Sequence, residues 1–188
     1  MKNSTRLAAL AALALSLLPD LAHAQARTRA TTGRARMELA FDHGYGLGTE
    51  GDYLELGVDL RVYAPEGIGA VVRGGVALAP ISIAYVVEAG LAYRLDLLSS
   101  EAFGVQLGLA AGPSFAYGPF DRGEVPALGG WAMLGLDLWH RNFFFGIGVT
   151  GHALGVLSDG GGDNHAPPRE GPLLTVTPTL RVGGDWGL

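Results

Sequence analysis

Eight segments of this chain alternate apolar and polar residues, and this period of two constrains the fold more than any other feature. In YLELGVDLRVY, residues 53–63, an aliphatic residue stands at every second position, and Glu55, Asp59 and Arg61 stand between them. Successive side chains of a strand point to opposite faces, so each segment predicts a strand with one apolar and one polar face. The eight segments span residues 34–45, 53–63, 69–78, 84–97, 103–117, 128–141, 143–154 and 173–188.

The composition favours a β protein with little charged surface. Charged residues make up 16% of the chain, against about 25% in an ordinary soluble domain. The 30 glycines are more than a helical protein tolerates, because glycine is unfavourable inside helices. Each segment has the length of roughly ten residues that a tilted transmembrane strand needs.

The first 24 residues are predicted to be a secretory signal peptide that is removed on export. Lys2 and Arg6 precede the apolar stretch LAALAALALSLL, and Ala22–Ala24 supplies small residues for cleavage. The alternative is a helical membrane anchor. It is disfavoured because the apolar run is short and is followed by Pro19 and Asp20.

Charge and cysteine content argue against a nucleic-acid-binding protein and against a protein stabilised by disulfides. The chain carries a net charge of −5, and Lys2 is its single lysine. Such a chain has no basic patch to neutralise phosphates, so nucleic acid is not expected as a partner. It contains no cysteine, so export does not serve disulfide formation.

The polar face of the segments is unlike a solvated surface. It consists largely of Gly, Ala, Ser and Thr with scattered arginines and carboxylates, whereas a soluble sheet would be rich in Lys, Glu and Thr. An eight-stranded barrel has an interior just wide enough for side chains to fill. Arginines and carboxylates can pair there, and buried charges need such partners. We therefore predict an interior polar network of Arg36, Glu38, Asp42, Glu55, Asp59, Arg61, Arg73, Glu88, Arg94, Asp96, Asp137, Arg141, His152, Arg181 and Asp185.

Aromatic residues gather near the segment ends. An interfacial girdle in a membrane barrel requires this placement, whereas core rings would favour the middle of strands. The girdle predicted from position is Tyr45, Tyr53, Tyr63, Tyr117, Phe120, Trp139, Phe143 and Trp186.

The chain stops inside its last segment with LRVGGDWGL, residues 180–188, where Leu180, Val182, Trp186 and Leu188 share one register. This resembles the terminal signature of outer-membrane barrels. The connections after odd-numbered segments are also mostly longer than those after even-numbered ones, as in barrels with short periplasmic turns and long extracellular loops. Residues 34–188 are thus similar to small eight-stranded outer-membrane β-barrels.

The resemblance implies an all-β fold, a closed antiparallel up-and-down eight-stranded transmembrane β-barrel. Its apolar face would meet lipid in the outer membrane of a Gram-negative envelope. Residues 1–24 would be the signal peptide, 25–33 a short N-terminal segment and 34–188 the barrel. The alternative fold is a soluble lipocalin-like binding barrel, whose apolar face would point inward.

Few residues could carry chemistry. His152 should point inward, where Ser114, Thr150, Asp42 or Glu88 could be its neighbours. A Ser–His–carboxylate group could hydrolyse lipid acyl chains, as in outer-membrane lipid-modifying hydrolases. A role for this histidine in a polar network is favoured, so no catalytic residue is assigned.

The stretch GGGDNHAPPRE, residues 160–170, contains three residue types that can ligate metals. Asp163, His165 and Glu170 have no diagnostic ligand spacing, and glycines and prolines dominate the stretch. An exposed loop is therefore favoured, and no metal or cofactor is predicted.

The sequence predicts a barrel with a structural or surface-interaction role and a polar interior filled by side chains. Its partners would be membrane lipid and an extracellular partner that contacts loop 156–172. Two other functions remain open: a lipid-modifying hydrolase, and a narrow, porin-like pore or small-ligand carrier.

Overall fold

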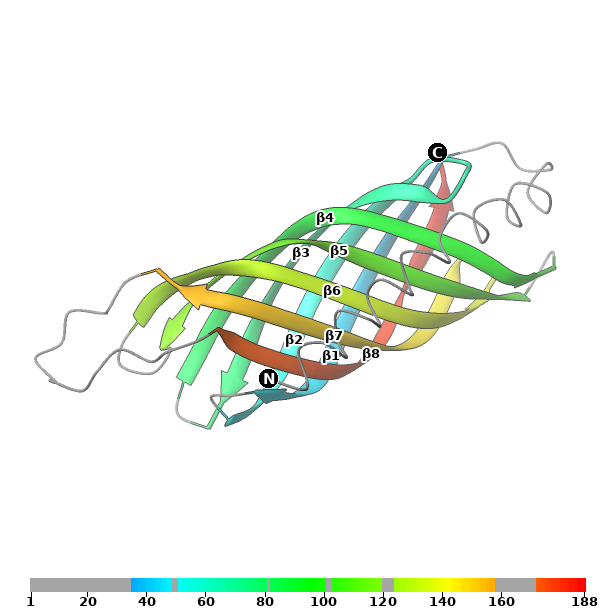
Figure 1. Ribbon diagram of the computed structural model, residues 1–188. Coiled ribbons are helices and arrows are strands. Elements are labelled where there is room, and N and C mark those ends of the chain that lie inside the picture. Colours follow the sequence, from blue (N-terminus) through cyan, green and yellow to red (C-terminus); the bar gives the residue numbers. More distant parts are fainter. Residues whose placement is uncertain (1–34, 49–50, 81, 101–102, 120–123, 158–171) are drawn as a thin grey trace, which may run out of the picture.

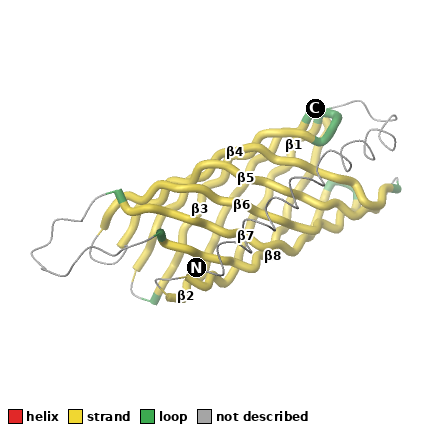
Figure 2. The backbone as a smooth tube through the Cα atoms, viewed as in Figure 1, coloured by secondary structure: helices red, strands yellow, loops and turns green. Residues whose placement is uncertain are grey.

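The computed structural model describes residues 35–48, 51–80, 82–100, 103–119, 124–157 and 172–188. Within them, eight strands form one closed antiparallel barrel in chain order, and β8 pairs with β1 (Figures 1 and 2). No helix in these ranges is long and apolar enough to cross a membrane. The strands are β1 (Arg36–Gly48), β2 (Gly51–Tyr63), β3 (Ile68–Ala79), β4 (Ser82–Ser99), β5 (Phe103–Pro119), β6 (Glu124–His140), β7 (Phe143–Val156) and β8 (Leu173–Gly187).

The predicted eight-stranded up-and-down barrel is confirmed, and each alternating segment coincides with one strand. One irregularity interrupts the pairing of β4 with β5, where the register shifts between Asp96 and Leu98. The signal peptide predicted at 1–24 and the segment predicted at 25–33 lie outside the described residues.

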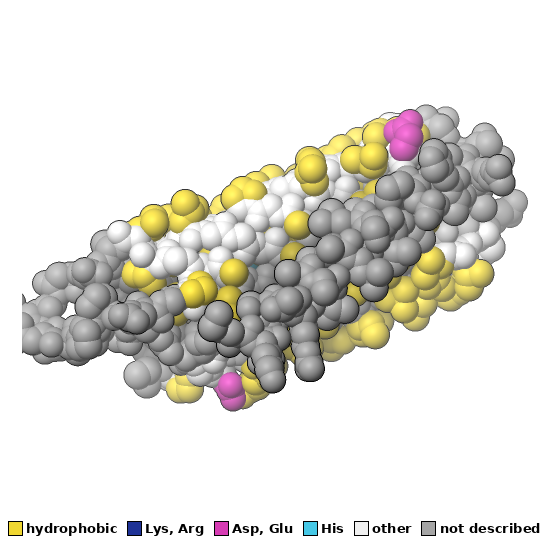
Figure 3. All heavy atoms as spheres, in the orientation of Figure 1, with side chains coloured by type: hydrophobic (Ala, Val, Ile, Leu, Met, Phe, Trp, Pro, Cys, Tyr) yellow, Lys and Arg dark blue, Asp and Glu magenta, His cyan; other side chains and the backbone are white. Residues whose placement is uncertain are grey.

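The apolar set of β2 lies on the outside of the barrel. Leu54, Leu56, Val58, Leu60 and Val62 are each 41–44% exposed. The other strands repeat this pattern, and Figure 3 shows hydrophobic side chains along the length of the barrel and acidic ones near its two ends. The outward apolar face means that the lipocalin-like alternative is wrong.

One predicted apolar-face residue departs from this pattern. Leu95 is 6% exposed, next to the register shift in β4, while Leu97 and Leu98 are 49% and 63% exposed. The bulge inserts an extra residue there, so the simple alternation does not continue to the end of the strand.

The two ends of the barrel differ in which connections they carry. At the terminal end, β1 begins beside the end of β8, with Arg36 opposite Gly187. At the loop end, β7 stops at Val156 and β8 starts at Leu173. The connections after β1, β3 and β5 lie at the same end as this one, because the strands alternate in direction.

Part of the predicted aromatic girdle is wrong. Tyr63 and Trp139 are 1% and 9% exposed and point into the barrel. Tyr53 also turns inward, and its hydroxyl lies 2.8 Å from Thr177 Oγ1. Phe120 lies outside the described residues. The outward members are Tyr45, Tyr117, Phe143 and Trp186, with exposures of 55, 40, 71 and 39%.

Inward aromatic rings stand opposite glycines on the neighbouring strand. Gly46 pairs with Tyr53, and a Cβ at this glycine would lie 2.1 Å from the ring atom Cζ. Gly104 pairs with Trp139 in the same way, and its Cβ would lie 2.3 Å from the indole. The glycine supplies the space that the ring occupies, which explains how a narrow barrel holds aromatic side chains inside.

Candidate functional site in the barrel interior

The structure places the predicted network residues inside the barrel, with one exception. Arg141 is exposed, because it lies in the two-residue turn between β6 and β7 with a φ of +55°. The alternation of the strand stops at His140, so extending it to Arg141 gave a wrong prediction. The others are buried or half-buried: Arg36, Glu38, Asp42, Glu55, Asp59, Arg61, Arg73, Glu88, Arg94, Asp96, Asp137, His152, Arg181 and Asp185.

Nearest the loop end lies the floor cluster, formed by Glu55, Arg73, Glu88 and His152. The Arg73 guanidinium donates from Nη2 to Glu55 Oε1 at 2.5 Å and from Nη1 to Glu88 Oε2 at 2.8 Å. Glu88 Oε1 lies 2.5 Å from His152 Nε2, and His152 Nδ1 lies 2.9 Å from Thr175 Oγ1. These charge-assisted bonds fix the cluster across four strands.

The middle cluster surrounds Arg181, whose side chain is fully buried. Its guanidinium donates to Asp137 Oδ2 at 2.7 Å, to Asp42 Oδ1 at 3.2 Å and to Asp59 Oδ2 at 3.3 Å. The second arginine of the cluster, Arg61, donates to Asp59 Oδ2 at 2.5 Å. One buried aspartate therefore serves two arginines.

The terminal cluster lies where the first and last strands meet. Arg94 Nη1 donates to Glu38 Oε1 at 2.5 Å and to Asp185 Oδ2 at 3.0 Å. Arg36 also pairs with Asp185, at 2.6 Å. Asp96 completes the cluster, at 3.9 Å from Arg94 Nε.

Aromatic rings pack against two of these arginines. The Arg94 guanidinium carbon lies 4.9 Å from the centre of the Tyr63 ring, and that of Arg181 lies 5.3 Å from the Phe144 ring. These are cation–π distances. The misassigned tyrosine therefore belongs to the interior network. Tyr63 is an even number of residues from Glu55, Asp59 and Arg61, so it shares their face of β2. This parity is the sequence signal that could have placed it inside the barrel.

Asp42 joins the floor and middle clusters, because its Oδ2 accepts from Arg73 Nε at 2.9 Å while Oδ1 accepts from Arg181. Across the described residues, the three clusters hold five arginines and eight carboxylates. The interior therefore has more acidic than basic groups. Burial in a confined space makes each pairing energetically important.

Above the floor cluster, toward the loop end, the barrel contains a cavity of about 1000 Å³, here called the vestibule. Its floor includes Glu55, His152 and Thr175, and Asp52, Tyr45 and Tyr53 also line it. The sequence did not predict this space. Its apolar wall is formed by Ala77, Ala79, Ala84, Val86, Ala116, Leu154 and Leu173.

The geometry around His152 does not fit a hydrolase. Ser114 Oγ donates to Glu88 Oε1 at 3.4 Å, and the histidine contacts the same oxygen. The carboxylate thus lies between the serine and the histidine, whereas activation of a serine requires the histidine to lie between the other two. No hydrogen bond joins Ser114 to His152 among the described residues.

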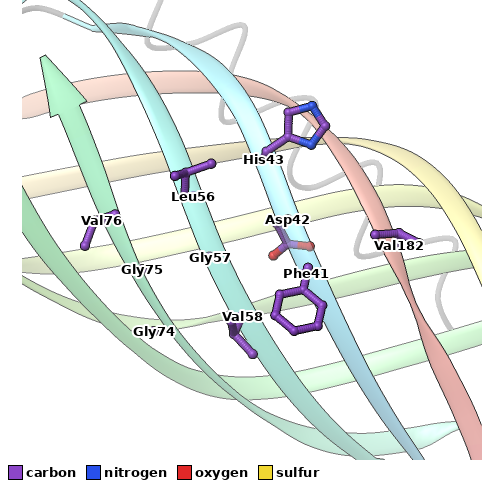
Figure 4. A pocket seen from close by; sticks show the side chains of 10 residues that line it. All are labelled: Phe41, Asp42, His43, Leu56, Gly57, Val58, Gly74, Gly75, Val76 and Val182. Atoms are coloured by element: carbon purple, nitrogen blue, oxygen red, sulfur yellow. The ribbon is translucent and has the colours of Figure 1, made fainter.

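A second hollow, of about 520 Å³, lies on the outer face over β1–β3 (Figure 4). Phe41, His43, Leu56 and Val58 surround it, and Gly74 leaves it open because it has no side chain. The described residues give the His43 ring no hydrogen-bond partner. This hollow therefore has the character of an apolar surface depression.

Metal ligation finds no support in the described part of the chain, which contains no group of three or more His, Cys, Asp or Glu side chains placed to hold an ion. Asp163, His165 and Glu170, the loop residues considered above, lie outside the described residues.

Of three comparisons with known proteins, the one with solved structures finds a similar architecture. No family model matches the chain, and no curated protein matches it in sequence. Among solved structures, the barrel is similar to Neisserial surface protein A, with a TM-score of 0.52, 10% identity, and coverage of 80% of this chain and 96% of that one.

Two further solved structures have lower scores. The N-terminal β-barrel domain of Pseudomonas aeruginosa OprF gives a TM-score of 0.48 at 10% identity, covering 82% of this chain and 100% of that one. The outer membrane protein OprG from Pseudomonas aeruginosa gives a TM-score of 0.42 at 10% identity, and the match covers 81% of this chain and 94% of that one. The closed strand order and the likeness to Neisserial surface protein A give the chain the fold of the small eight-stranded outer-membrane β-barrels. At this identity the likeness concerns the fold alone.

Proposed function

We propose that this protein is an outer-membrane barrel without an open pore, and that it acts through the loops at its loop end. The observation that carries the proposal is the interior, where three clusters of paired charged side chains occupy the barrel below the vestibule. An eight-stranded barrel has no room for a water-filled channel beside such side chains.

The outward apolar face supports the membrane location. Large apolar side chains are exposed on every strand, and aromatic side chains such as Tyr45 and Phe143 lie outward near opposite ends. Lipid would cover this surface, while water would leave it unfavourably exposed. Export through the signal peptide at 1–24 belongs to the same proposal, and mass spectrometry of membrane-extracted protein should show a chain that begins after Ala24.

Planar-bilayer recording tests the closed interior. The unmutated protein should give no steady large conductance, because paired side chains occupy the barrel below the vestibule. A stable open channel would overturn the proposed closed interior in favour of the porin-like function.

The surface role is tested by protease treatment of intact cells that export the protein. Loop 156–172 joins β7 to β8 at the loop end, which would face outward if both chain termini face the periplasm. Protease should cut within this loop without lysing the cells, and a peptide of residues 156–172 should compete with an extracellular partner. Cleavage only after lysis would contradict the proposed orientation.

A further inference from the structure

His43 on β1 is a polar side chain on the outward, apolar face of the barrel. Along the strand it lies between Phe41 and Tyr45, which are both exposed. Across the strand pairs its neighbours are Leu56 on β2 and Leu180 on β8. No described residue forms a hydrogen bond with the His43 ring. The barrel itself therefore supplies no partner for this imidazole among the residues that the structure describes.

A partner for His43 is within reach of its position on the strand. An imidazole without one is unfavourable in hydrocarbon, because no water is present there to bond to its N–H. His43 lies two residues from Tyr45, which is about 7 Å along a strand. Tyr45 is one of the outward aromatic residues near the loop end, and such rings lie at the level of lipid headgroups. His43 is thus close enough to this level to bond to an acceptor oxygen of a lipid.

The hollow over β1–β3 begins beside His43 and extends away from the loop end (Figure 4). His43 and Leu56, which pair across β1 and β2, line it on the side of the loop end. Two residues farther from the loop end, Phe41 pairs with Val58, and Val58 pairs with Gly74. The lining is therefore polar near the headgroup level and apolar toward the middle of the membrane.

Gly74 gives the hollow its depth. It faces outward on β3, and a Cβ at this position would meet no atom within 4 Å. The exposed Val58 and Val87 are its partners on β2 and β4. A glycine within a strand often marks a place where a ligand approaches the backbone. The resulting volume of about 520 Å³ lies within the usual range for ligand pockets, about 300–1,000 Å³, and its apolar lining suits a hydrocarbon chain.

We propose that this hollow binds one phospholipid of the leaflet at the loop end, with a phosphate oxygen accepting from the His43 ring and an acyl chain lying over Gly74. The lipid would supply the partner that His43 lacks, and its chain would fill the space that the glycine leaves. The inference rests on the membrane location proposed above. It is independent of the closed interior and of the loop role.

Native mass spectrometry of the protein purified in octyl glucoside tests the site, because it counts the lipids bound during a titration with dioleoylphosphatidylglycerol. The first lipid should bind at least about tenfold more tightly than the second, since only one lipid can occupy the hollow. Successive dissociation constants that differ only by statistical factors would overturn the proposal.

Three variants locate the tight site. Gly74→Phe should abolish it, because the ring enters the hollow without a clash. His43→Phe keeps an aromatic ring and removes the hydrogen bond, so it should weaken the first lipid about fivefold. Ile147→Phe, at an outward position on β7, is the matched control and should bind the first lipid like the unmutated protein. Unchanged binding by Gly74→Phe or His43→Phe, or an equal loss in Ile147→Phe, would overturn the proposal.

Heat-modifiable migration on a gel verifies that each variant folds, and His43→Phe decides the matter if Gly74→Phe does not fold. The same mass spectra count the protein copies in each particle. A dimer that Gly74→Phe separates would overturn the lipid site in favour of a second copy on this face.

Flotation of the unmutated protein with dioleoylphosphatidylcholine vesicles tests the membrane location separately. Protein that floats with the vesicles but binds no lipid tightly would contradict the lipid site alone. Protein that does not float would contradict the membrane location and, with it, the lipid site.

Discussion

Two regions of the same barrel interior differ in what fills them. Below the vestibule, arginines, carboxylates and rings such as Phe144 pack between the strands. In the vestibule, the inward positions hold alanines such as Ala84 and Ala116, and a cavity of about 1000 Å³ remains. Both regions are enclosed by the same eight strands. The inward side chains, as well as the number of strands, therefore decide how much space a small barrel contains.

The largest effect is expected from Arg181→Ala, in the filled region. The change leaves Asp42, Asp59 and Asp137 short of a donor, and loss of one partner from a buried ionic group costs about 3–5 kcal/mol. Urea unfolding in phospholipid vesicles, followed by tryptophan fluorescence, measures the free energy of unfolding.

Two further arginine variants calibrate this result. Arg61→Ala should cost less, because its partner Asp59 keeps Arg181. Arg141→Ala, in the exposed turn, should change stability by no more than about 0.5 kcal/mol. Equal losses for Arg181 and Arg141 would mean that the charged interior does not hold the barrel together.

The next largest effect is expected from Val58→Arg. Val58 lies on the outer face of β2, one of the eight strands that enclose both regions. Val58 is 41% exposed and lies near the middle of its strand. An arginine facing lipid at mid-membrane costs about 2–4 kcal/mol. The same urea titration gives the loss, and undiminished stability in liposomes would show that this face does not meet lipid.

A smaller loss is expected from Gly146→Ala, which tests how tightly the filled region is packed. A Cβ at Gly146 would lie 1.8 Å from Asp137 Oδ1, so the aspartate must move away from Arg181. Overpacking of this kind costs about 1–3 kcal/mol. Gly155→Ala is the control on the same strand, because its Cβ would lie 3.7 Å from the nearest atom. Equal stability of the two variants would argue against tight packing.

The smallest effect is expected from Ala77→Phe in the vestibule. The larger side chain enters the cavity and displaces no packed group, so its cost should be about 1 kcal/mol or less, below the usual cost of overpacking. Urea unfolding of this variant beside Gly146→Ala compares the two regions directly. A greater loss for Ala77→Phe would mean that the vestibule is not empty space.

The alternation of apolar and polar residues predicted the strands and, for most residues, whether the side chain points outward or inward. It could do so because a period of two requires only local geometry. It failed at Arg141, where a turn ends the strand, and at the bulge after Asp96. Tyr63 lies near a strand end, as a girdle residue would, but it shares the inward parity of Arg61 and is buried. Aromatic residues at strand ends do not all face lipid, because those opposite a glycine, such as Tyr53 beside Gly46, can turn inward.

The pairing of charges and the vestibule could not be predicted in the same way. Which carboxylate meets Arg73 depends on the stagger of strands around the barrel, and its partners come from β1, β2 and β4. The cavity depends on the summed volumes of inward side chains from β1–β5, β7 and β8. Neither the choice of ion-pair partners nor the volume of the cavity follows from a local pattern of residues.

The ion pairs between β1 and β8 also have a consequence for how the barrel assembles. Arg181 on β8 bonds to Asp42 on β1, 139 residues earlier, and Arg36 bonds to Asp185 across 149 residues. These pairs form only when the first and last strands meet. A sheet that has entered the bilayer before its edges join would carry unpaired charges and open backbone edges, both of which are costly in lipid. Insertion and closure are therefore expected to be coupled in a single cooperative step.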